Sequence, residues 1–492
     1  MKVLHHYIEN TEIKIFLKKV LIISGILHLL SAIFSTGFYH WDEQYQIYEF
    51  LGAKLGFTSF SDLTWEYPHK MRSWIQPGLY YLFAKPMTWI GLGSPFTMAF
   101  VFRLITSAIG FISLFYLNLA TLKWIKDFKY SKWAILLTHF LWFIPFIQSR
   151  TSSESMSGAL FALAIALITL NEKENKLRTH FAIGLLMGLS FQFRFQMGFT
   201  VMFAWFWQLF LGNRYYKGIF LQAFAIIVCF GLEILIAKWG YGEWTFTPWN
   251  YVYENLVLNK QAGWGGMPWY DYFRLTLARG VPPISLFIVF GVTFFWMTNP
   301  KHLLTWATLP LLVIHSAISA KALRYMFPIA CFTPILMTLF YVDLQRMNIP
   351  LKEMTRKNWF RKLLRLTLGL NIILLMIFTF KPANSMVNLM SYLYSSKINN
   401  VQLYGTNIFR PIDHPANFFK SSDLNYKMYS DINEMLASKE TTYKIVDRVK
   451  WAKLGLERDC QIRYSTLPSF LINFSSFKFI EKTRAWTLLE CK

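Results

Sequence analysis

The sequence predicts a polytopic α-helical membrane protein, because it combines a low charge content with many long apolar stretches. Hydrophobic residues make up 54% of the 492 residues and aromatic residues 18%, whereas Asp, Glu, Lys and Arg together make up only 16%. A soluble domain carries about 25% charged residues. The chain therefore has too few charges to cover the surface of a soluble protein of this length. It is also too apolar to stay disordered.

Apolar stretches of nearly spanning length recur along the first 380 residues. A helix needs roughly 20 mostly apolar residues to cross a bilayer. We expect about eleven transmembrane helices, near residues 16–36, 96–122, 133–149, 153–171, 180–194, 197–211, 217–238, 280–298, 302–319, 324–342 and 363–380. The two stretches within 180–211 also fit a single broken hairpin.

The basic residues provide a separate indication of topology. The net charge is +23, and the Lys and Arg residues occur as short clusters between apolar stretches rather than as one patch. Cytoplasmic loops of membrane proteins carry such an excess of positive charge, so no nucleic-acid partner is expected. Alternate loops are basic, starting with Lys14, Lys18 and Lys19. With eleven crossings, the N-terminus is expected in the cytosol and the segment after residue 381 on the opposite side.

Three segments are too long to be simple connections between helices. Residues 37–95 contain Gly, Pro and many aromatic residues, and they are expected to form short amphipathic helices on the membrane surface. Residues 239–279 form a second outer loop that is rich in Trp, Tyr and Gly. We therefore expect a transmembrane domain over 1–380. Short alternating segments predict a small extracytosolic domain, α/β or mostly β, over 381–492.

The sequence contains four Cys, too few for a disulfide framework or a Cys-rich metal site. Cys229 and Cys331 lie in apolar stretches and are expected to be packing residues. Cys460 and Cys491 share the polar C-terminal segment. They are able to form a disulfide only if this segment faces an oxidising compartment.

Two adjacent acidic residues follow the first apolar stretch, in the segment His40–Gln46, which reads HWDEQYQ. A carboxylate in a partly dry cleft has its pKa raised toward the range of a general base, and a glycosyl transfer needs a base to accept a hydroxyl proton. Asp42 is our candidate for this base. The alternative interpretation is that Asp42 caps the following helix.

The segment His40–Gln46 resembles the H-P-D-E-x-x-Q signature of the Alg9-like mannosyltransferases, glycosyltransferase family 22. Further segments match the family in the same order: Leu63–Tyr67 with Arg72, Ser73, Trp74 and Pro77, then Arg150–Glu154, then Tyr241 and Gly242 with Phe246–Tyr251, and then Gly265–Phe273. The segment Leu63–Tyr67, together with the residues from Arg72 to Pro77, resembles the third GPI mannosyltransferase branch of the family. Together the matches extend from residue 16 to about residue 345.

This resemblance implies a GT-C fold whose active site is built from non-cytosolic loops. It also implies a polyprenyl-phosphate sugar donor, usually dolichyl-phosphate mannose, and inversion at the anomeric carbon. Neither a metal nor another cofactor is expected. The chain departs from the family where Met267 and Asp271 replace two His, and where Ala320 and Ala322 flank Lys321 in place of His and Glu.

We assign the candidate site residues by role. Asp42 is the expected base, and Glu43 orients it or binds sugar hydroxyls. Cations at the outer ends of apolar stretches are expected to bind the donor phosphate by charge-assisted hydrogen bonds: Arg150, Lys321 and Arg324. The acceptor or the sugar is expected to contact His40, Gln46, Glu66, Arg72, Glu154, Trp249 and Asn250.

Each of these roles has a structural alternative. Arg and Lys at helix ends also extend to the membrane interface and anchor the helix, and Trp249 also fits an interfacial aromatic belt. Arg103 and Arg194 lie within apolar stretches, where an unpaired charge is costly. They need a carboxylate, carbonyl or phosphate partner, and Glu233 is a candidate for either.

The sequence thus predicts a multi-pass inverting glycosyltransferase that moves a hexose, expected to be mannose, from a polyprenyl-phosphate donor to a lipid-linked or GPI-like glycan. The expected partners are this donor, the glycan acceptor and membrane lipids, in either a bacterial inner membrane or the endoplasmic reticulum membrane. One alternative is a GT-C enzyme that places another sugar on lipid A or protein. Another is a transporter or flippase, although the paired repeats typical of transporters are not evident. An inactive scaffold is the third.

Overall fold

The computed structural model describes residues 10–347, 350–412, 414–447, 460–467 and 485–491. The chain divides into two compact units. Unit 1 contains residues 1–34, 66–76 and 102–381, and unit 2 contains residues 35–65, 77–101 and 382–492. The C-terminal segment, which the sequence suggests as a separate domain, thus shares its unit with two segments from the N-terminal quarter of the chain.

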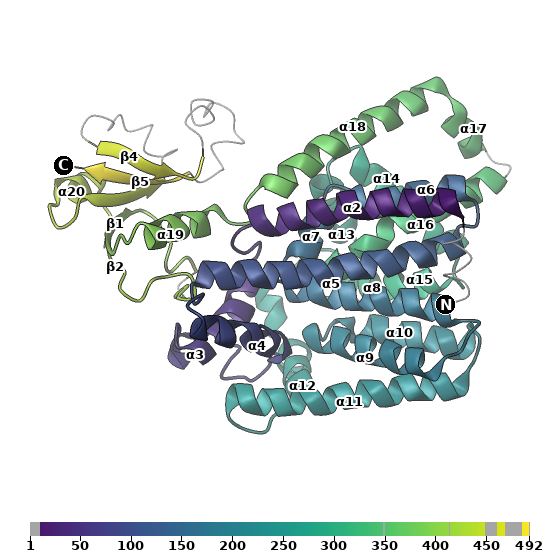
Figure 1. Ribbon diagram of the computed structural model, residues 1–492, viewed down its shortest axis with the longest axis horizontal. Helices are drawn as coiled ribbons and strands as arrows, with labels where there is room; N and C mark the ends of the chain where they lie inside the picture. The colour runs from purple at the N-terminus through teal and green to yellow at the C-terminus, as the bar shows by residue number, and fades with distance from the viewer. Residues whose placement is uncertain (1–9, 348–349, 413, 448–459, 468–484, 492) are drawn as a thin grey trace. The chain divides into compact units, whose positions relative to one another are not determined.

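Unit 1 is a helical bundle (Figure 1). Its longer helices are α2 (Thr11–Phe34), most of α5 (Pro95–Trp124), α6 (Phe128–Phe140), α8 (Ser153–Asn171), α9 (Leu177–Phe193), α10 (Met197–Phe210), α11 (Tyr216–Tyr241), α14 (Ile284–Thr298), α15 (Leu303–Ala317), α16 (Thr333–Arg346) and α18 (Asn358–Phe380). Shorter elements connect them: α7 (Ile144–Ser149), α12 (Thr247–Val252), η3 (Tyr253–Val257), η4 (Lys260–Trp264), α13 (Asp271–Arg279), η5 (Leu323–Phe332) and α17 (Pro350–Arg356).

Among the described residues, six helical segments are long and apolar enough to cross a membrane, or seven if α14 and α15, which bend by 118°, count as one span. The expected count of about eleven is not reproduced. The difference arises at the expected spans 280–298 and 302–319, which correspond to this bent pair, and at those over 133–149, 180–194 and 197–211. There the structure has a break between α6 and α7, and α9 and α10 have only 17 and 14 residues. At 1.5 Å per residue, α10 is about 21 Å long, less than the thickness of a bilayer core.

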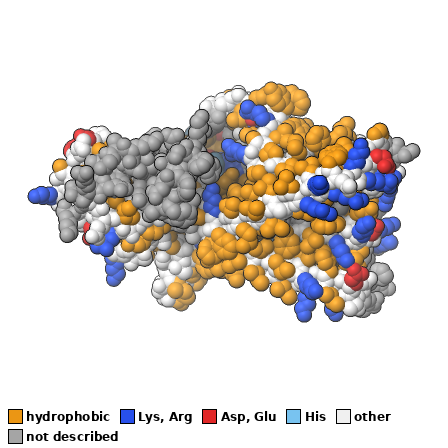
Figure 2. Space-filling view, turned by 90° about the horizontal axis from the view of Figure 1, so that it is seen from above, with side chains coloured by type: hydrophobic (Ala, Val, Ile, Leu, Met, Phe, Trp, Pro, Cys, Tyr) orange, Lys and Arg blue, Asp and Glu red, His pale blue; other side chains and the backbone are white. Residues whose placement is uncertain are grey.

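The surface of the bundle is apolar. Figure 2 shows that hydrophobic side chains cover much of one face, and that Lys and Arg gather at the end where α2 begins and α17 lies. Exposed large side chains occur along α2 and α11, including Ile22, Ile26, Phe220 and Ile227. Such a surface is typical of helices in contact with lipid.

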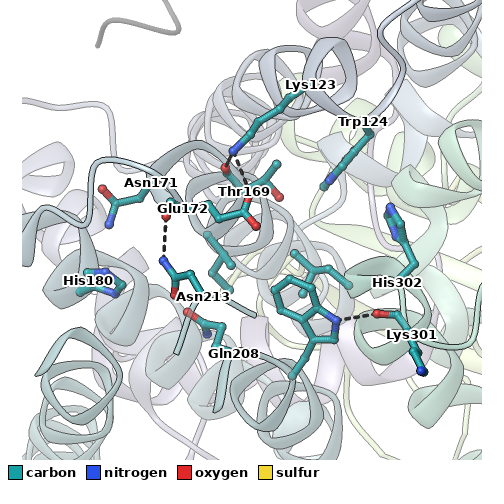
Figure 3. A pocket seen from close by; sticks show the side chains of 13 residues that line it. Lys123, Trp124, Thr169, Asn171, Glu172, His180, Gln208, Asn213, Lys301 and His302 are labelled. Carbon is teal, nitrogen blue, oxygen red and sulfur yellow. Dashed lines mark hydrogen bonds and ion pairs between the residues drawn. The ribbon is translucent and has the colours of Figure 1, made fainter. Parts of the chain in front are cut away.

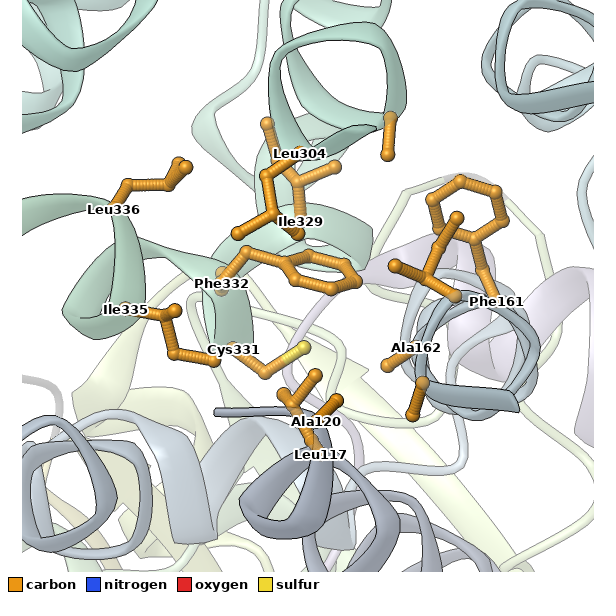
Figure 4. Packing of buried hydrophobic residues seen from close by; sticks show 14 of the residues in the cluster. Leu117, Ala120, Phe161, Ala162, Leu304, Ile329, Cys331, Phe332, Ile335 and Leu336 are labelled. Carbon is orange, nitrogen blue, oxygen red and sulfur yellow. The ribbon is translucent and has the colours of Figure 1, made fainter. Parts of the chain in front are cut away.

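The core of unit 1 lies between α5, α8, α15, η5 and α16. Figure 4 shows this packing, in which the side chains of Leu117, Ala120, Phe161, Ala162, Leu304, Ile329, Cys331, Phe332, Ile335 and Leu336 are buried. Cys331 packs there as a free thiol. The close approach of α8 to η5 depends on Gly158, where an added Cβ would lie 2.5 Å from the Cα of Pro328.

Unit 2 combines residues 35–65 and 77–101 with a small mixed sheet. Its helical elements are η1 (Glu43–Tyr48), α3 (Glu49–Leu55), η2 (Phe60–Asp62), most of α4 (Ile75–Trp89), α19 (Ser385–Ser395) and α20 (Ile432–Ala437). Its strands are β1 (Asn400–Tyr404), β2 (Asn425–Tyr429), β3 (Tyr443–Asp447), β4 (Cys460–Ser465) and β5 (Trp486–Cys491), in the order β2-β1-β3-β5-β4.

The sheet is parallel at one side and antiparallel at the other. Strand β1 runs parallel to β2 and β3, and β5 runs antiparallel to β3 and β4. The pair Cys460 and Cys491 stands in register across β4 and β5 and forms a disulfide. The ring of Tyr392 in α19 stacks on Tyr464 in β4, with the centroids 4.7 Å apart. This arrangement confirms the expected small α/β fold at the C-terminus.

Candidate active site

A buried carboxylate lies between two arginines at one end of unit 1. Glu154, in the first turn of α8, accepts a hydrogen bond from Arg324 Nη1 at 2.7 Å and forms an ion pair with Arg194 Nη1 at 3.0 Å. All three side chains are less than one tenth exposed. Arg194 also donates to the hydroxyl of Ser153 at 3.1 Å. One negative charge therefore faces two positive charges, and the cluster is cationic.

The packing of the neighbouring helices brings these residues together. The hydroxyl of Ser157 in α8 donates to the carbonyl of Ser190 in α9 at 2.7 Å, and these serines lie about one turn from Glu154 and Arg194. On the other side of α8, Gly158 packs on Pro328, which follows Arg324 in η5. Ser157 and Gly158 thus set the distances from Glu154 to Arg194 and Arg324.

Tyrosine rings line the cationic cluster. The guanidinium groups of Arg194 and Arg324 lie 5.0 and 4.8 Å from the ring centroid of Tyr325. The guanidinium of Arg72 lies 5.3 Å from the ring of Tyr251. Burial raises the pKa of Tyr251, so this residue stays a neutral hydrogen-bonding group. Cations close to aromatic faces are stabilised by the ring quadrupole.

A second ion pair lies in the segment that precedes α4. Arg72 Nη2 contacts Glu66 Oε1 at 2.5 Å, and Glu66 is buried. The backbone of Arg72 is bound to Tyr241, whose hydroxyl donates to the Arg72 carbonyl at 2.9 Å. Trp74 packs against Gly240, where an added Cβ would lie 2.2 Å from the indole. The end of α11 therefore fixes the position of Arg72.

The other expected site residues of unit 1 differ in how far they are buried and in what they contact. Arg150 is fully buried after α7, with its guanidinium 5.5 Å from the ring of Phe146.

Lys321 donates to the carbonyls of Met267 and Ile318 at 3.0 and 2.6 Å, and burial lowers its pKa. Asn250 donates to the Lys70 carbonyl and to Thr245. Trp249 is 59% exposed. Lys321 and Asn250 thus hold loops together, whereas Trp249 is accessible.

The acidic motif lies in unit 2, at the start of the π-helix η1. Asp42 is the residue before η1, and its side chain makes no capping hydrogen bond there. Its carboxylate is 27% exposed and lies 3.3 Å from His40 Nδ1. Glu43 is buried and accepts a hydrogen bond from the Tyr39 amide at 2.9 Å. Gln46 is half-buried. Of the two acids, Asp42 is therefore the accessible one and Glu43 braces the turn that precedes η1.

The expected site residues are thus divided between the two units. Unit 1 brings together Glu154 and Arg324, and separately Glu66 and Arg72, whereas unit 2 brings together His40, Asp42 and Glu43. The pairing of Arg194 with Glu154 is not predicted from the sequence, where Glu233 is the candidate partner for both Arg194 and Arg103. Glu233 instead accepts a hydrogen bond from Thr247, and Arg103 donates to the Ala32 carbonyl at 2.7 Å.

A cavity of about 270 Å³ lies at the other end of α8 (Figure 3). It is lined by residues at the ends of α5, α8 and α10 and at the start of α15, among them Lys123, Glu172, Gln208 and His302. Lys123 forms an ion pair with Glu172 at 3.0 Å. None of the expected site residues lines this cavity. The first residue of α8 in its lining, Ile168, lies 14 residues after Glu154, which is about 21 Å along the helix.

Comparison with known proteins decides the family. The model of the Alg9-like mannosyltransferase family matches residues 19–412. The chain belongs to the Alg9-like mannosyltransferase family. The match extends past α18 into β1 and the connection that follows it, so it includes part of the C-terminal segment that the motifs alone do not reach.

Curated members of this family resemble the chain over part of their length. GPI alpha-1,2-mannosyltransferase 3 of Danio rerio is 24% identical over 343 residues, which cover 68% of this chain and 61% of that protein. The protein of the same name from Mus musculus is 25% identical over 56% of this chain and 50% of its own length. The chain thus spans between about half and three fifths of these relatives.

Solved structures share the fold at low sequence identity. ArnT from Cupriavidus metallidurans, bound to undecaprenyl phosphate, aligns with a TM-score of 0.55 and 11% identity over 96% of this chain and 97% of that one. The Archaeoglobus fulgidus oligosaccharyltransferase aligns with a TM-score of 0.51 and 12% identity, over 87% of this chain and 68% of that one. The GT-C fold expected from the motifs is therefore confirmed for this family member.

Proposed function

We propose that this protein is an inverting membrane mannosyltransferase. It transfers mannose from a polyprenyl-phosphate donor to a hydroxyl of a lipid-linked or GPI-like glycan. Membership in the Alg9-like mannosyltransferase family supports the reaction type, and the name of the zebrafish relative supports a GPI-like acceptor. The structural observation that supports the proposal most directly is the buried cationic cluster of Arg194 and Arg324 around Glu154.

In the proposed reaction, Asp42 is the general base. The acceptor hydroxyl attacks the anomeric carbon on the face opposite the phosphate, and its proton passes to the Asp42 carboxylate. A bond forms between the acceptor oxygen and the anomeric carbon, while the bond from that carbon to the phosphate oxygen breaks. The accessible carboxylate of Asp42 and the buried one of Glu43 support this division of roles, because a base must reach its substrate.

The arginines stabilise the leaving group. As the bond to the anomeric carbon breaks, the polyprenyl phosphate gains negative charge, which fixed guanidinium groups stabilise without reorganisation. Arg194 and Arg324 are held by Glu154 and by the Tyr325 ring, so their positions are set before the donor binds. Arg150 adds a further buried cation at the start of the segment that leads into α8. No acid is needed, because a phosphate is already a good leaving group.

The acceptor glycan is assigned to the group formed by Arg72, Glu66 and Trp249. Arg72 and Glu66 offer a paired donor and acceptor for sugar hydroxyls, and Trp249 offers an exposed ring for stacking. His40 and Gln46 are assigned to the sugar near Asp42. We place the site on the non-cytosolic face of a bacterial inner membrane or of the endoplasmic reticulum membrane, with the N-terminus in the cytosol. The Cys460–Cys491 disulfide supports an oxidising compartment for the C-terminal segment.

The test uses the purified full-length chain in liposomes with a total lipid extract from the host. Radiolabelled mannose is supplied on dolichyl phosphate in one arm and on undecaprenyl phosphate in another. Further arms carry glucose or aminoarabinose on the same lipids. We expect label from a mannose donor in a glycolipid. Transfer only from the other sugars contradicts the mannose assignment, and label that crosses the bilayer without forming a glycolipid favours a flippase.

A further inference from the structure

The helix that carries the acidic motif is bonded to the C-terminal segment through one buried carboxylate. Glu49 is the first residue of α3, directly after η1, and it is 1% exposed. Its Oε1 accepts hydrogen bonds from Gln44 Nε2 at 2.6 Å and from the backbone amide of Phe418 at 3.1 Å. Its Oε2 accepts one from the Thr58 hydroxyl at 2.5 Å. Glu49 thus connects η1 to Thr58, which follows α3, and to Phe418 in the C-terminal segment.

Other contacts join the same two parts of the chain. The hydroxyl of Tyr45, in η1, donates to the His414 carbonyl at 2.8 Å. The ring of Tyr48 packs against those of Phe418 and Phe419, with centroids 5.0 and 5.2 Å away. Asn417 donates to Asp62 at 3.0 Å. The segment 414–419 therefore contacts η1, the first residue of α3 and η2.

The start of the motif is also tied to the C-terminal segment. The carbonyl of Thr36 accepts hydrogen bonds from the amides of Ala383 and Asn384, both at 3.0 Å. An added Cβ on Gly37 would lie 2.9 Å from the Asn384 side chain, and Gly37 has a φ of 78°. The stretch from Thr36 to Glu49, which contains Asp42, is therefore held at both ends by residues after 382.

We propose that Glu49 is a positioning residue, which bonds the segment 414–419 to η1 and thereby fixes the direction of the Asp42 carboxylate. This inference rests on the proposed function, in which Asp42 is the base. A π-helix is rare and occurs mostly as a single turn, frequently at a functional site. Here η1 is held by the contacts of Tyr45 and Tyr48 with the segment 414–419, and by the bond from Gln44 to Glu49. Residues 382–419 are in this view part of the framework of the active site.

A conservative substitution of Glu49 separates its hydrogen bonds from its charge. In Glu49→Gln, the amide oxygen is able to accept from Gln44 and Phe418, while the amide nitrogen donates to Thr58. This variant keeps all three contacts without a charge. Glu49→Leu keeps the approximate volume but leaves the three donors buried and without an acceptor, which opens the contact. Glu434→Leu, on the exposed face of α20, is the matched control for the same substitution.

Two measurements on the full-length proteins test the proposal. We expect Glu49→Leu to lower kcat roughly 10- to 100-fold with little change in KM for the donor, because a displacement of about 1 Å at a reacting group has an effect of this size. Glu49→Gln is expected to restore kcat to within about threefold of wild type. Amide hydrogen exchange over residues 43–48 should accelerate about tenfold or more in Glu49→Leu, and not in Glu49→Gln or Glu434→Leu.

The outcomes separate this proposal from the proposed function. Exchange over 43–48 that is unchanged in Glu49→Leu overturns the bonding role, whether or not the enzyme is active. Faster exchange with an unchanged kcat overturns the positioning role. If the wild-type protein transfers sugar from none of the donors, this result counts against the proposed function and therefore against the positioning of a base. The exchange data still decide whether Glu49 holds η1.

Discussion

Glu154 and Arg324 are 170 residues apart in the sequence, yet their side chains meet at 2.7 Å in the interior of unit 1. The same carboxylate contacts Arg194, so a single negative charge holds two guanidinium groups in place. Without Glu154, two buried positive charges would repel each other. The carboxylate therefore allows the protein to keep a concentrated positive charge away from water.

Replacement of Glu154 by Gln should strongly destabilise unit 1. Removal of one partner from a buried ion pair typically reduces the free energy of unfolding by about 3–5 kcal/mol, since an uncompensated charge stays behind. Thermal unfolding of purified protein in detergent measures the effect. The control is Glu172→Gln at the opposite end of α8, where the half-exposed pair with Lys123 should contribute about 1 kcal/mol or less. Equal effects of the two variants would contradict the assigned role of Glu154.

Replacement of Gly158 by Ala should push α8 away from η5. The new Cβ would lie 2.5 Å from the Pro328 Cα, a backbone atom that has no rotamer to change. Overpacking of this kind reduces the free energy of unfolding by about 1–3 kcal/mol. Gly231 in α11 has no atom within 4 Å of an added Cβ, so Gly231→Ala should be neutral or stabilising. A loss of stability only at Gly231 would show that the helix packing differs from that described.

The stability of unit 2 should fall as pH rises from about 4.5 to about 7. Burial raises the pKa of Glu49 from 4.5 to about 7, although hydrogen bonds from Thr58, Phe418 and Gln44 oppose the shift. The folded state therefore binds the proton more tightly than the unfolded state, and deprotonation opposes folding. The Tyr45 hydroxyl is coupled to Glu49, whose charge raises the pKa of Tyr45, while Arg410 acts on Tyr45 in the opposite direction.

Hydrogen exchange at the Phe418 amide and over residues 43–48, corrected for the intrinsic pH dependence, measures this change. In wild type the protection should decrease between pH 5 and pH 8. In Glu49→Gln the protection should not change over this range, because the amide does not titrate. A wild type whose protection stays constant or increases over the same range would contradict the predicted sign.

The disulfide between Cys460 and Cys491 should be present in the protein purified from its native membrane. Denatured but unreduced protein should then expose two reactive thiols, those of Cys229 and Cys331, and reduction should expose four. A double variant with Ser at 460 and 491 should lower the free energy of unfolding of unit 2 by about 2–4 kcal/mol. Labelling of four thiols before reduction would place this segment in a reducing compartment.

The class of fold is predictable from the sequence because it depends on the composition and on the lengths of the apolar stretches. Both quantities are sums over many residues. Fewer helices of spanning length are found among the described residues than the eleven apolar stretches, because hydropathy does not register where a helix breaks, as at Leu141 between α6 and α7. Asp42, Glu154 and Arg324 are candidate site residues because they lie in segments that resemble motifs of the Alg9-like mannosyltransferase family, and their roles stay predictions.

Partners distant in the sequence were not predictable in the same way. Arg194 lies in an apolar stretch, so the sequence indicates that it needs an acidic partner. The residues around Arg194 do not indicate whether this partner is Glu154 or Glu233. The contact depends on the packing of Ser157 on Ser190. The association of residues 35–65 with residues 382–492 was likewise not predictable, because it rests on contacts between distant residues, such as the hydrogen bond from the Phe418 backbone amide to the Glu49 carboxylate.

The measurement that tests the central claim most directly compares wild type, Asp42→Asn and Glu434→Gln in liposomes with the mannose donors and a host lipid extract. Asp42→Asn keeps the size of the side chain but removes the base, and loss of general-base catalysis slows a reaction about 10²- to 10⁴-fold. We predict that wild type and Glu434→Gln form labelled glycolipid at similar rates and that Asp42→Asn is slower by this factor. Equal rates for all three proteins would contradict Asp42 as the base.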